Sequence, residues 1–181
     1  MANRIVLITG SPRNGNSAAM AYAFEQAAKK RGNEVIRFDA NSLYVEGCRA
    51  CGQCYKVPGI ACGLTDDFNK IADAVLSCNA VVFATPLYYF GVSAQLKAVI
   101  DRFYTLNNPK EQMMEKQSVL LVSQAQPSAN ASAGLMMMIR EIAHYYHWLE
   151  RGSVIACDVR APGDIEKTAY LDQAYALGKS L

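Results

Sequence analysis

Continuous apolar runs alternate along the chain with amphipathic stretches whose apolar residues stand three and four positions apart. The runs are typical of strands buried on both faces, and the spaced stretches are typical of helices that cover them. Strands are predicted at residues 5–9, 34–38, 80–85, 118–123 and 152–157. Helices are predicted at residues 16–30, 66–76, 93–106 and 135–149, and from Asp164 to the C-terminus. Five strands alternating with five helices require a parallel sheet with helices on both faces, a three-layer α/β fold.

The chain of 181 residues is long enough for one domain with a full core, and we predict a single domain over residues 1–181. Residues 39–64 follow no regular period, and a cysteine-bearing insertion is placed at about 45–64. In open parallel sheets, ligands bind outside the carboxyl ends of the strands. The loops that follow the first four strands are therefore expected to converge on one crevice.

The first of these loops, Gly10-Ser-Pro-Arg-x-Gly-Asn-Ser17, leads from a buried strand into a helix. Such a turn points backbone N–H groups and a helix dipole at one spot, which suits a phosphate. Asn16 stands where a triphosphate-binding loop needs lysine, and Pro12 replaces the second glycine of a dinucleotide fingerprint. The remaining hydroxyls and the one cation, on Ser11, Ser17 and Arg13, fit a terminal monophosphate. The alternative is an ordinary turn with a Ser/Asn cap.

Three aromatic residues, Tyr88, Tyr89 and Phe90, follow the third strand directly, on a loop that begins at Pro86. Exposed rings on a loop need something to cover them. A planar heterocycle would serve, and so would a second subunit packed over the loop. The two interpretations do not exclude each other.

The glycine loop, taken together with Thr85-Pro-Leu-Tyr-Tyr-Phe-Gly-Val-Ser-Ala-Gln-Leu-Lys-x-x-Ile-Asp-Arg102, resembles the flavodoxin-like NAD(P)H-dependent FMN reductases over the whole chain. The resemblance implies the strand order 2-1-3-4-5 and FMN as cofactor. It assigns the FMN phosphate to Ser11, Arg13, Asn16 and Ser17. It assigns the ring edge to Pro86, Leu87, Tyr88, Tyr89, Phe90 and Gly91, and a third, less regular contact to Ser123 and Gln124. The matching helix residues Asp101 and Arg102 are interpreted as structural.

Four cysteines follow the second strand with the spacing Cys48-x-x-Cys51-x-x-Cys54-x7-Cys62. Thiolates this close together can hold a [4Fe–4S] cluster or a zinc ion. The spacing resembles the compact cysteine motif of the iron–sulfur flavoproteins, with Pro58 and Gly59 offering the bend it needs. The alternative is a set of cysteines that holds nothing or oxidises to disulfides. The remaining cysteines, Cys78 and Cys157, are expected to be buried.

The net charge of +2 does not favour nucleic acid or a membrane as partner. No apolar run is long enough to span a bilayer and no signal-peptide pattern is visible, so a cytoplasmic location with reduced thiols is expected. The segment 135–149 is apolar over most of its circumference. We therefore predict a homodimer or homotetramer.

These observations predict an FMN-dependent oxidoreductase that takes a hydride from NAD(P)H and passes electrons to a small-molecule or protein acceptor. One alternative is a non-enzymatic FMN electron carrier or redox-sensing module that can also hold an Fe–S cluster. Another is a nucleotide-binding regulator with a zinc-stapled loop.

Overall fold

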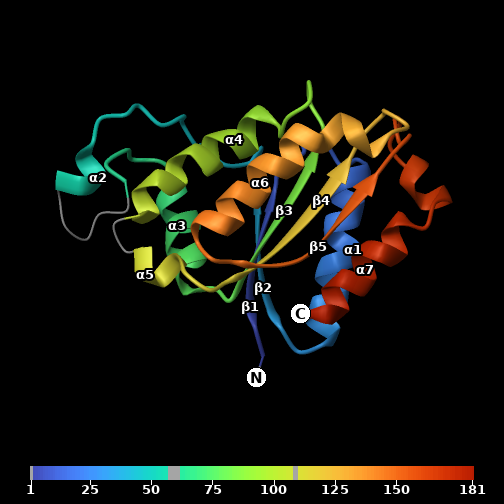
Figure 1. Cartoon of the computed structure of the whole chain (residues 1–181), viewed down its shortest axis with the longest axis horizontal. Helices are drawn as coiled ribbons and strands as arrows, with labels where there is room; N and C mark the ends of the chain where they lie inside the picture. Colours follow the sequence, from blue (N-terminus) through green and yellow to red (C-terminus); the bar gives the residue numbers. More distant parts are fainter. Residues whose placement is uncertain (1, 57–61, 108–109) are drawn as a thin grey trace.

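The computed structural model describes residues 2–56, 62–107 and 110–181. Its centre is a five-stranded sheet in the order β2-β1-β3-β4-β5, with every neighbouring pair parallel. The strands are β1 (Arg4–Thr9), β2 (Glu34–Asp39), β3 (Ala80–Pro86), β4 (Gln117–Ser123) and β5 (Leu149–Ala156). Figure 1 shows them running in one direction, so their carboxyl ends meet at one edge. The predicted fold class and strand order are confirmed.

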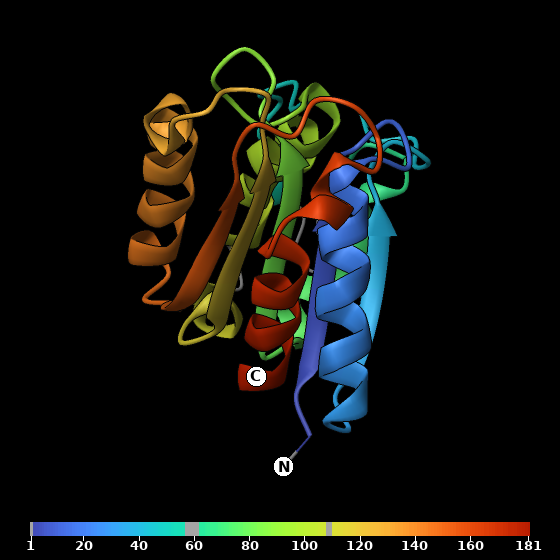
Figure 2. The same ribbon diagram turned by 90° about the vertical axis from the view of Figure 1, so that its right-hand side faces the viewer.

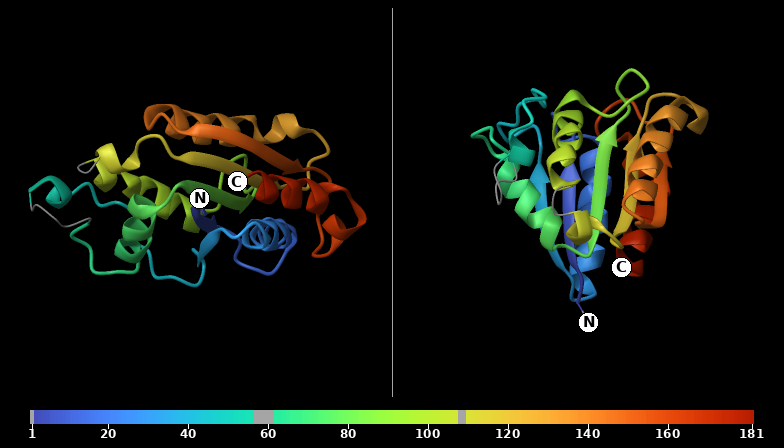
Figure 3. Two further views of the ribbon diagram at one scale, coloured as in Figure 1. Left: turned by 90° about the horizontal axis from the view of Figure 1, so that it is seen from below. Right: turned by 60° about the vertical axis from the view of Figure 1, so that its left-hand side comes forward.

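Helices cover both faces of this sheet. The pair α1 (Asn16–Lys30) and α7 (Tyr170–Ser180) lies side by side on one face, as Figures 1 and 2 both show. The other face carries α3 (Phe68–Ser77), α4 (Ala94–Asp101) and α6 (Ala133–Tyr145). The view from below in Figure 3 shows the sheet between α6 and the α1–α7 pair. The prediction of three layers is therefore correct.

The two core clusters follow from the alternation of side chains along β1. Ile5 and Leu7 pack with α1 and α7, whereas Val6 and Ile8 pack with α3 and α4. All four side chains are fully buried. A strand whose successive side chains point to opposite faces can be apolar throughout only if both faces are covered.

Several predicted boundaries were wrong for identifiable reasons. The helix predicted at 93–106 ends as α4 at Asp101 and continues as the 3-10 helix η1 (Arg102–Asn107). The helix predicted to reach residue 149 stops at Tyr145, because His147 adopts a positive φ of 53° and Leu149 already belongs to β5. Asp164 does not cap the last helix. Its carboxylate accepts the N–H groups of Arg160 and Ala161 instead.

The structure also contains short helical elements that the sequence pattern did not indicate. They are α2 (Gln53–Lys56), α5 (Lys110–Met113), η2 (Ala129–Ser132) and η3 (Asp164–Lys167). A search of the described residues finds no helix with the length and apolar character needed to cross a membrane.

Candidate flavin site and cysteine cavity

The loop after β1 leaves the sheet at Gly10. The Gly10 N–H donates to the carbonyl of Ala84 on β3 at 2.8 Å. A Cβ atom at this position would overlap the hydroxyl of Ser93 and lie 2.8 Å from the Cβ of Leu96, at the start of α4. Only glycine fits here, so this residue fixes where the loop crosses the end of the sheet.

The loop then folds into a compact turn before α1. The Ser11 hydroxyl donates to the carbonyl of Arg13 at 2.5 Å, and the Gly15 N–H donates to the same carbonyl at 2.9 Å. Among the described side chains, none caps the N-terminus of α1, where Gly15 is the N-cap residue. The first-turn N–H groups and the positive end of the helix dipole are therefore available to an anion.

Asn16 and Ser17 are buried at the start of α1, with 6% and 2% of their surface exposed. The Asn16 side chain donates to the carbonyl of Ala161 at 3.0 Å and accepts the N–H of Ile165 at 3.4 Å. The amide thus ties the segment after β5 to the start of α1. Its part in holding a ligand would come through its backbone N–H.

One pocket of about 110 Å³ joins the loops that follow β1, β3, β4 and β5 at the carboxyl edge of the sheet. The residues predicted to bind FMN that line it are Ser11, Arg13, Asn16, Ser17, Pro86, Leu87, Tyr88, Ser123 and Gln124. The pocket also contains Gly15, Ala125, Val159 and Arg160, which the sequence analysis missed. Val159 and Arg160 follow the fifth strand, so the rule that selected the other loops would have found them.

The aromatic turn after β3 is a two-residue hairpin. Tyr88 and Gly91 exchange backbone hydrogen bonds of 3.0 and 3.1 Å, and the two residues between them have positive φ angles, 47° at Tyr89 and 69° at Phe90. Two consecutive positive φ values are typical of a type I′ turn, which normally contains Asn and Gly. Bulky residues there are strained, and such strain persists mainly at functional sites.

The turn places its rings outside the pocket. Tyr89 is 99% exposed and Phe90 60% exposed, and neither they nor Gly91 lines the pocket. Tyr88 does line it. The turn is anchored to the sheet by the Leu87 N–H, which donates to the carbonyl of Ser123 at 2.8 Å.

Gln124, at the carboxyl end of β4, is 2% exposed. Its side-chain nitrogen donates to the carbonyls of Gln126 and Ser128, at 3.1 and 2.7 Å. Its side-chain oxygen is buried and has no hydrogen-bond partner among the described residues. This pocket-lining acceptor can therefore receive a donor from a bound molecule.

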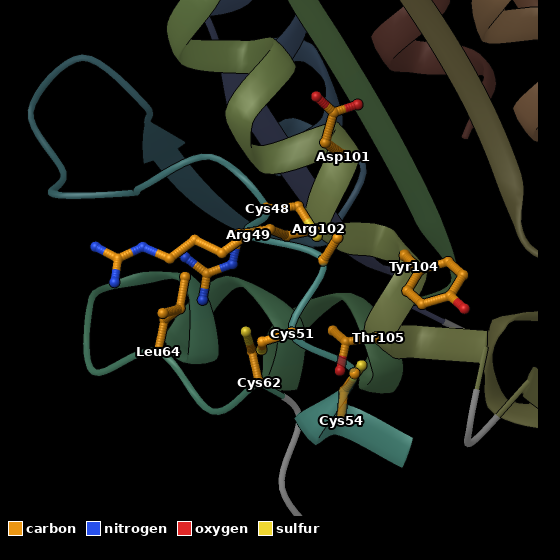
Figure 4. A pocket seen from close by; sticks show the side chains of 12 residues that line it. Cys48, Arg49, Cys51, Cys54, Cys62, Leu64, Asp101, Arg102, Tyr104 and Thr105 are labelled. Carbon is orange, nitrogen blue, oxygen red and sulfur yellow. The ribbon is translucent and has the colours of Figure 1, made fainter. Parts of the chain in front are cut away.

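The four clustered cysteines line a second cavity of about 370 Å³, shown in Figure 4. The expectation that their loop would converge on the first pocket is wrong, because the two pockets share no residue. The backbone after β2 is tied to the start of α3 instead. The Tyr44 N–H donates to Asp67 at 3.0 Å and the Glu46 N–H to Asp66 at 2.9 Å. These bonds lead the chain away from the glycine loop.

Within the cavity, Cys48 and Cys51 are exposed, Cys62 is half-buried and Cys54 is buried. Among the described residues, no three His, Cys, Asp or Glu side chains converge closely enough to hold a single metal ion. A [4Fe–4S] cluster needs a different arrangement. Each of its four thiolates binds a different iron atom, so the four cysteines need to surround one cavity rather than meet at one point. Pro58 and Gly59, expected to supply the bend before Cys62, lie outside the described residues.

Arg102, Tyr104 and Thr105 form the η1 wall of this cavity. Arg102 pairs with the Asp66 carboxylate, donates to the carbonyl of Glu46 at 3.3 Å and stacks 4.3 Å from the ring centre of Phe68. Burial by itself would raise the pKa of Asp66, but hydrogen bonds from Arg102 and two backbone N–H groups outweigh it and hold that pKa below its usual value. Arg102 therefore forms a buried ion pair with Asp66 rather than with its sequence neighbour. Its neighbour Asp101 pairs with Lys97 on the surface.

The fold and the edge pocket define a flavodoxin-like α/β protein. The chain belongs to the NADPH-dependent FMN reductase family, whose sequence model matches residues 3–158. Membership makes it an oxidoreductase of the NAD(P)H-dependent flavin type, with FMN as cofactor and a nicotinamide nucleotide as co-substrate.

Relatives of two kinds match the sequence. A Bacillus subtilis protein whose name describes an NAD(P)H-dependent FMN-containing oxidoreductase is 29% identical over 173 residues, covering 90% of this chain and 88% of its own. An iron–sulfur flavoprotein of Archaeoglobus fulgidus is 35% identical over 100 residues, covering 55% of this chain. This match spans 44% of that protein, so the chain aligns with about half of the relative's length.

The fold is also shared with solved structures. The NAD(P)H:quinone oxidoreductase from Methanothermobacter marburgensis superimposes with a TM-score of 0.76 at 17% identity, over 99% of this chain and 96% of its own. A likeness at this identity concerns the fold alone.

Proposed function

We propose that FMN binds in the pocket between the start of α1 and the aromatic turn, and that electrons taken from NAD(P)H leave this site for a small-molecule or protein acceptor. The main support for the proposal is one pocket at the carboxyl edge of the sheet. Residues of the glycine loop, Ser11 to Ser17, and of the Pro86–Tyr88 segment line it together.

The residues present fit an FMN phosphate. The uncapped N-terminus of α1 offers N–H groups, and Arg13 and Arg160 both line the pocket. A volume of about 110 Å³ is smaller than the roughly 300–1,000 Å³ typical of sites that enclose a whole ligand. We infer that the pocket takes the phosphate end and leaves the flavin ring against the aromatic turn.

When bound, FMN would supply the redox chemistry, because its ring can accept a hydride from NAD(P)H and release electrons to an acceptor. The pocket-lining residues accordingly include no carboxylate and no histidine within the described chain. Arg13 and Arg160 neutralise the phosphate, the exposed rings of Tyr89 and Phe90 shield one side of the flavin from water, and the Gln124 oxygen accepts a hydrogen bond.

A turnover measurement tests this function. Protein loaded with FMN is expected to oxidise NADH or NADPH in the presence of a quinone or of free flavin. An electron carrier predicts negligible turnover until a partner reductase is added. A protein that takes up FMN but never oxidises nicotinamide in either assay would contradict the enzymatic proposal.

We further propose that Cys48, Cys51, Cys54 and Cys62 hold a [4Fe–4S] cluster that relays single electrons between the flavin and the acceptor. Support comes from the common cavity of the four thiols and from the names of the iron–sulfur flavoproteins among the relatives. Anaerobic purification followed by iron, sulfide and zinc analysis tests this role. About four irons per chain are expected, whereas zinc without iron would favour a stapled loop.

The protein is still predicted to form a homodimer or homotetramer. It is supported by exposed apolar side chains on and beside α6, with Met137 at 52%, Tyr145 at 51% and Leu149 at 58% exposure. Light scattering of the FMN-loaded protein tests it, and a monomeric mass would contradict it.

A further inference from the structure

The cysteine cavity is walled by hydrogen-bond donors that lack acceptors. Within the described residues, the buried polar side-chain atoms without a partner include Nε and Nη2 of Arg102 and Oγ1 of Thr105. Both side chains are buried, at 1% and 4% exposure. Both lie on η1 and both line the cavity that holds the four cysteines (Figure 4).

Buried hydrogen-bond donors without an acceptor lower the free energy of unfolding. A guanidinium has no acceptor atoms, and a threonine hydroxyl can donate one hydrogen bond. Burying such groups without an acceptor lowers stability, so native proteins rarely keep them without a functional reason. The simplest complement is a group of negatively charged atoms held in the same cavity.

Arg102 is also held more rigidly than a surface arginine. One of its nitrogens, Nη1, makes the contacts to Asp66 and to the Glu46 carbonyl, and the ring of Phe68 lies 4.3 Å from the guanidinium carbon. The hydrogen bonds among these contacts involve only one edge of the guanidinium. A purely structural role would need that edge alone, and it gives no account of the unpartnered Nε and Nη2.

We propose that Arg102 and Thr105 are positioning residues that donate hydrogen bonds to the sulfur atoms of a cluster held by Cys48, Cys51, Cys54 and Cys62. This inference rests on the cluster proposed above. One-electron reduction adds one negative charge to the cluster, and the electron comes from the flavin that NAD(P)H has reduced. Hydrogen bonds to the sulfurs favour the more negative, reduced form, so the two residues raise the midpoint potential.

Thr105→Val tests this with little risk to the fold, since valine matches threonine in shape and the hydroxyl has no partner to lose. In the metal-free protein the variant is expected to unfold at an equal or higher urea concentration than the wild type. In the cluster-loaded protein, the ratio of reduced to oxidised cluster at a fixed potential is expected to fall roughly threefold to tenfold. A tenfold change corresponds to about 59 mV for a one-electron couple.

Thr168→Val is the matched control. The Thr168 hydroxyl donates to the Ile165 carbonyl at 2.7 Å, away from the cysteine cavity. This variant is expected to lose some stability and to keep the wild-type potential. Arg102→Lys, which keeps the charge beside Asp66 but loses the planar donors, should lower the potential further if it folds.

The outcomes separate the two proposals. Full iron content with an unchanged potential and unchanged electron paramagnetic resonance spectrum in Thr105→Val would overturn the role of η1 and leave the cluster intact. Failure of the wild type to take up iron under anaerobic reconstitution would overturn the cluster, and this inference with it. A lowered potential in Thr105→Val alone, with Thr168→Val unchanged, supports the inference.

Discussion

Arg102 and Asp66 form an ion pair in which each side chain is 1% exposed. The Asp66 carboxylate also accepts the N–H groups of Glu46 and Phe68, at 2.9 and 3.1 Å. One buried carboxylate therefore joins the segment after β2, the start of α3 and the start of η1. Arg102, one member of this junction, also lines the cysteine cavity.

Asp66→Asn is expected to lower the free energy of unfolding at pH 7 by about 3–5 kcal/mol, because it leaves the buried charge of Arg102 uncompensated. The pKa of Asp66 is lowered in the folded protein, so its contribution is complete above the unfolded value of about 3.9. That contribution is lost as pH falls through the lower, folded pKa. Urea unfolding at several pH values should show the difference between variant and wild type shrinking only below about pH 4.

Glu34→Gln is the control for this prediction. Glu34 pairs with Arg4 at 3.1 Å, and both side chains are about half exposed. Surface pairs contribute about 0–1 kcal/mol, so the variant should be nearly as stable as the wild type. Equal losses in the two variants would mean that the buried pair has no special role.

Asn16→Ala is expected to lower the free energy of unfolding of the FMN-free protein by about 1–3 kcal/mol, since the Ala161 carbonyl and the Ile165 N–H lose their partner. The increase in hydrogen exchange should be greatest in the segment after β5. A variant as stable as the wild type, but weaker in binding FMN, would instead place the Asn16 side chain on the ligand.

Relieving the strain in the aromatic turn is expected to stabilise the fold and to weaken FMN binding. Replacing Tyr89 by Asn and Phe90 by Gly gives the residues that a type I′ turn prefers. The double variant is expected to gain about 1 kcal/mol in unfolding free energy and to bind FMN more weakly. Tyr22→Asn, at an exposed position in the helix α1, should give no such gain. A double variant that gains stability with unchanged FMN affinity would remove the turn from the flavin site.

The six cysteines should differ in their reactivity toward a thiol reagent. Cys78 is 4% exposed, and burial raises the pKa of its thiol, whereas Cys48 and Cys51 are exposed. In the metal-free protein, the exposed pair is expected to be labelled first by a disulfide reagent, and Cys78 only after unfolding. Cys157, expected to be buried, is half-buried and should react at an intermediate rate. Early labelling of Cys78 would contradict this order.

The fold was predictable from sequence because β1, β3 and β4 contain continuous apolar runs, and such runs require helices on both faces of the sheet. The grouping of the glycine loop with Pro86, Leu87 and Tyr88 was predictable from the shared carboxyl edge. The separate cysteine cavity was not predictable from sequence. Arg102 in its wall pairs with Asp66, 36 residues away in the chain, and hydrophobic periodicity does not encode such a contact. The end of α6 was missed because His147 adopts a positive φ, which hydrophobic periodicity does not indicate.

The central claim is that the pocket at the start of α1 binds the phosphate of FMN. Titrating the FMN-free protein with FMN and with riboflavin, in the wild type and in Arg13→Gln, tests it most directly. Arg31→Gln, an exposed position at the other end of α1, serves as the control. We predict that Arg13→Gln weakens FMN binding about tenfold and leaves riboflavin binding unchanged, whereas Arg31→Gln leaves the binding of both molecules unchanged. Equal affinity of the wild type for FMN and riboflavin would contradict the account.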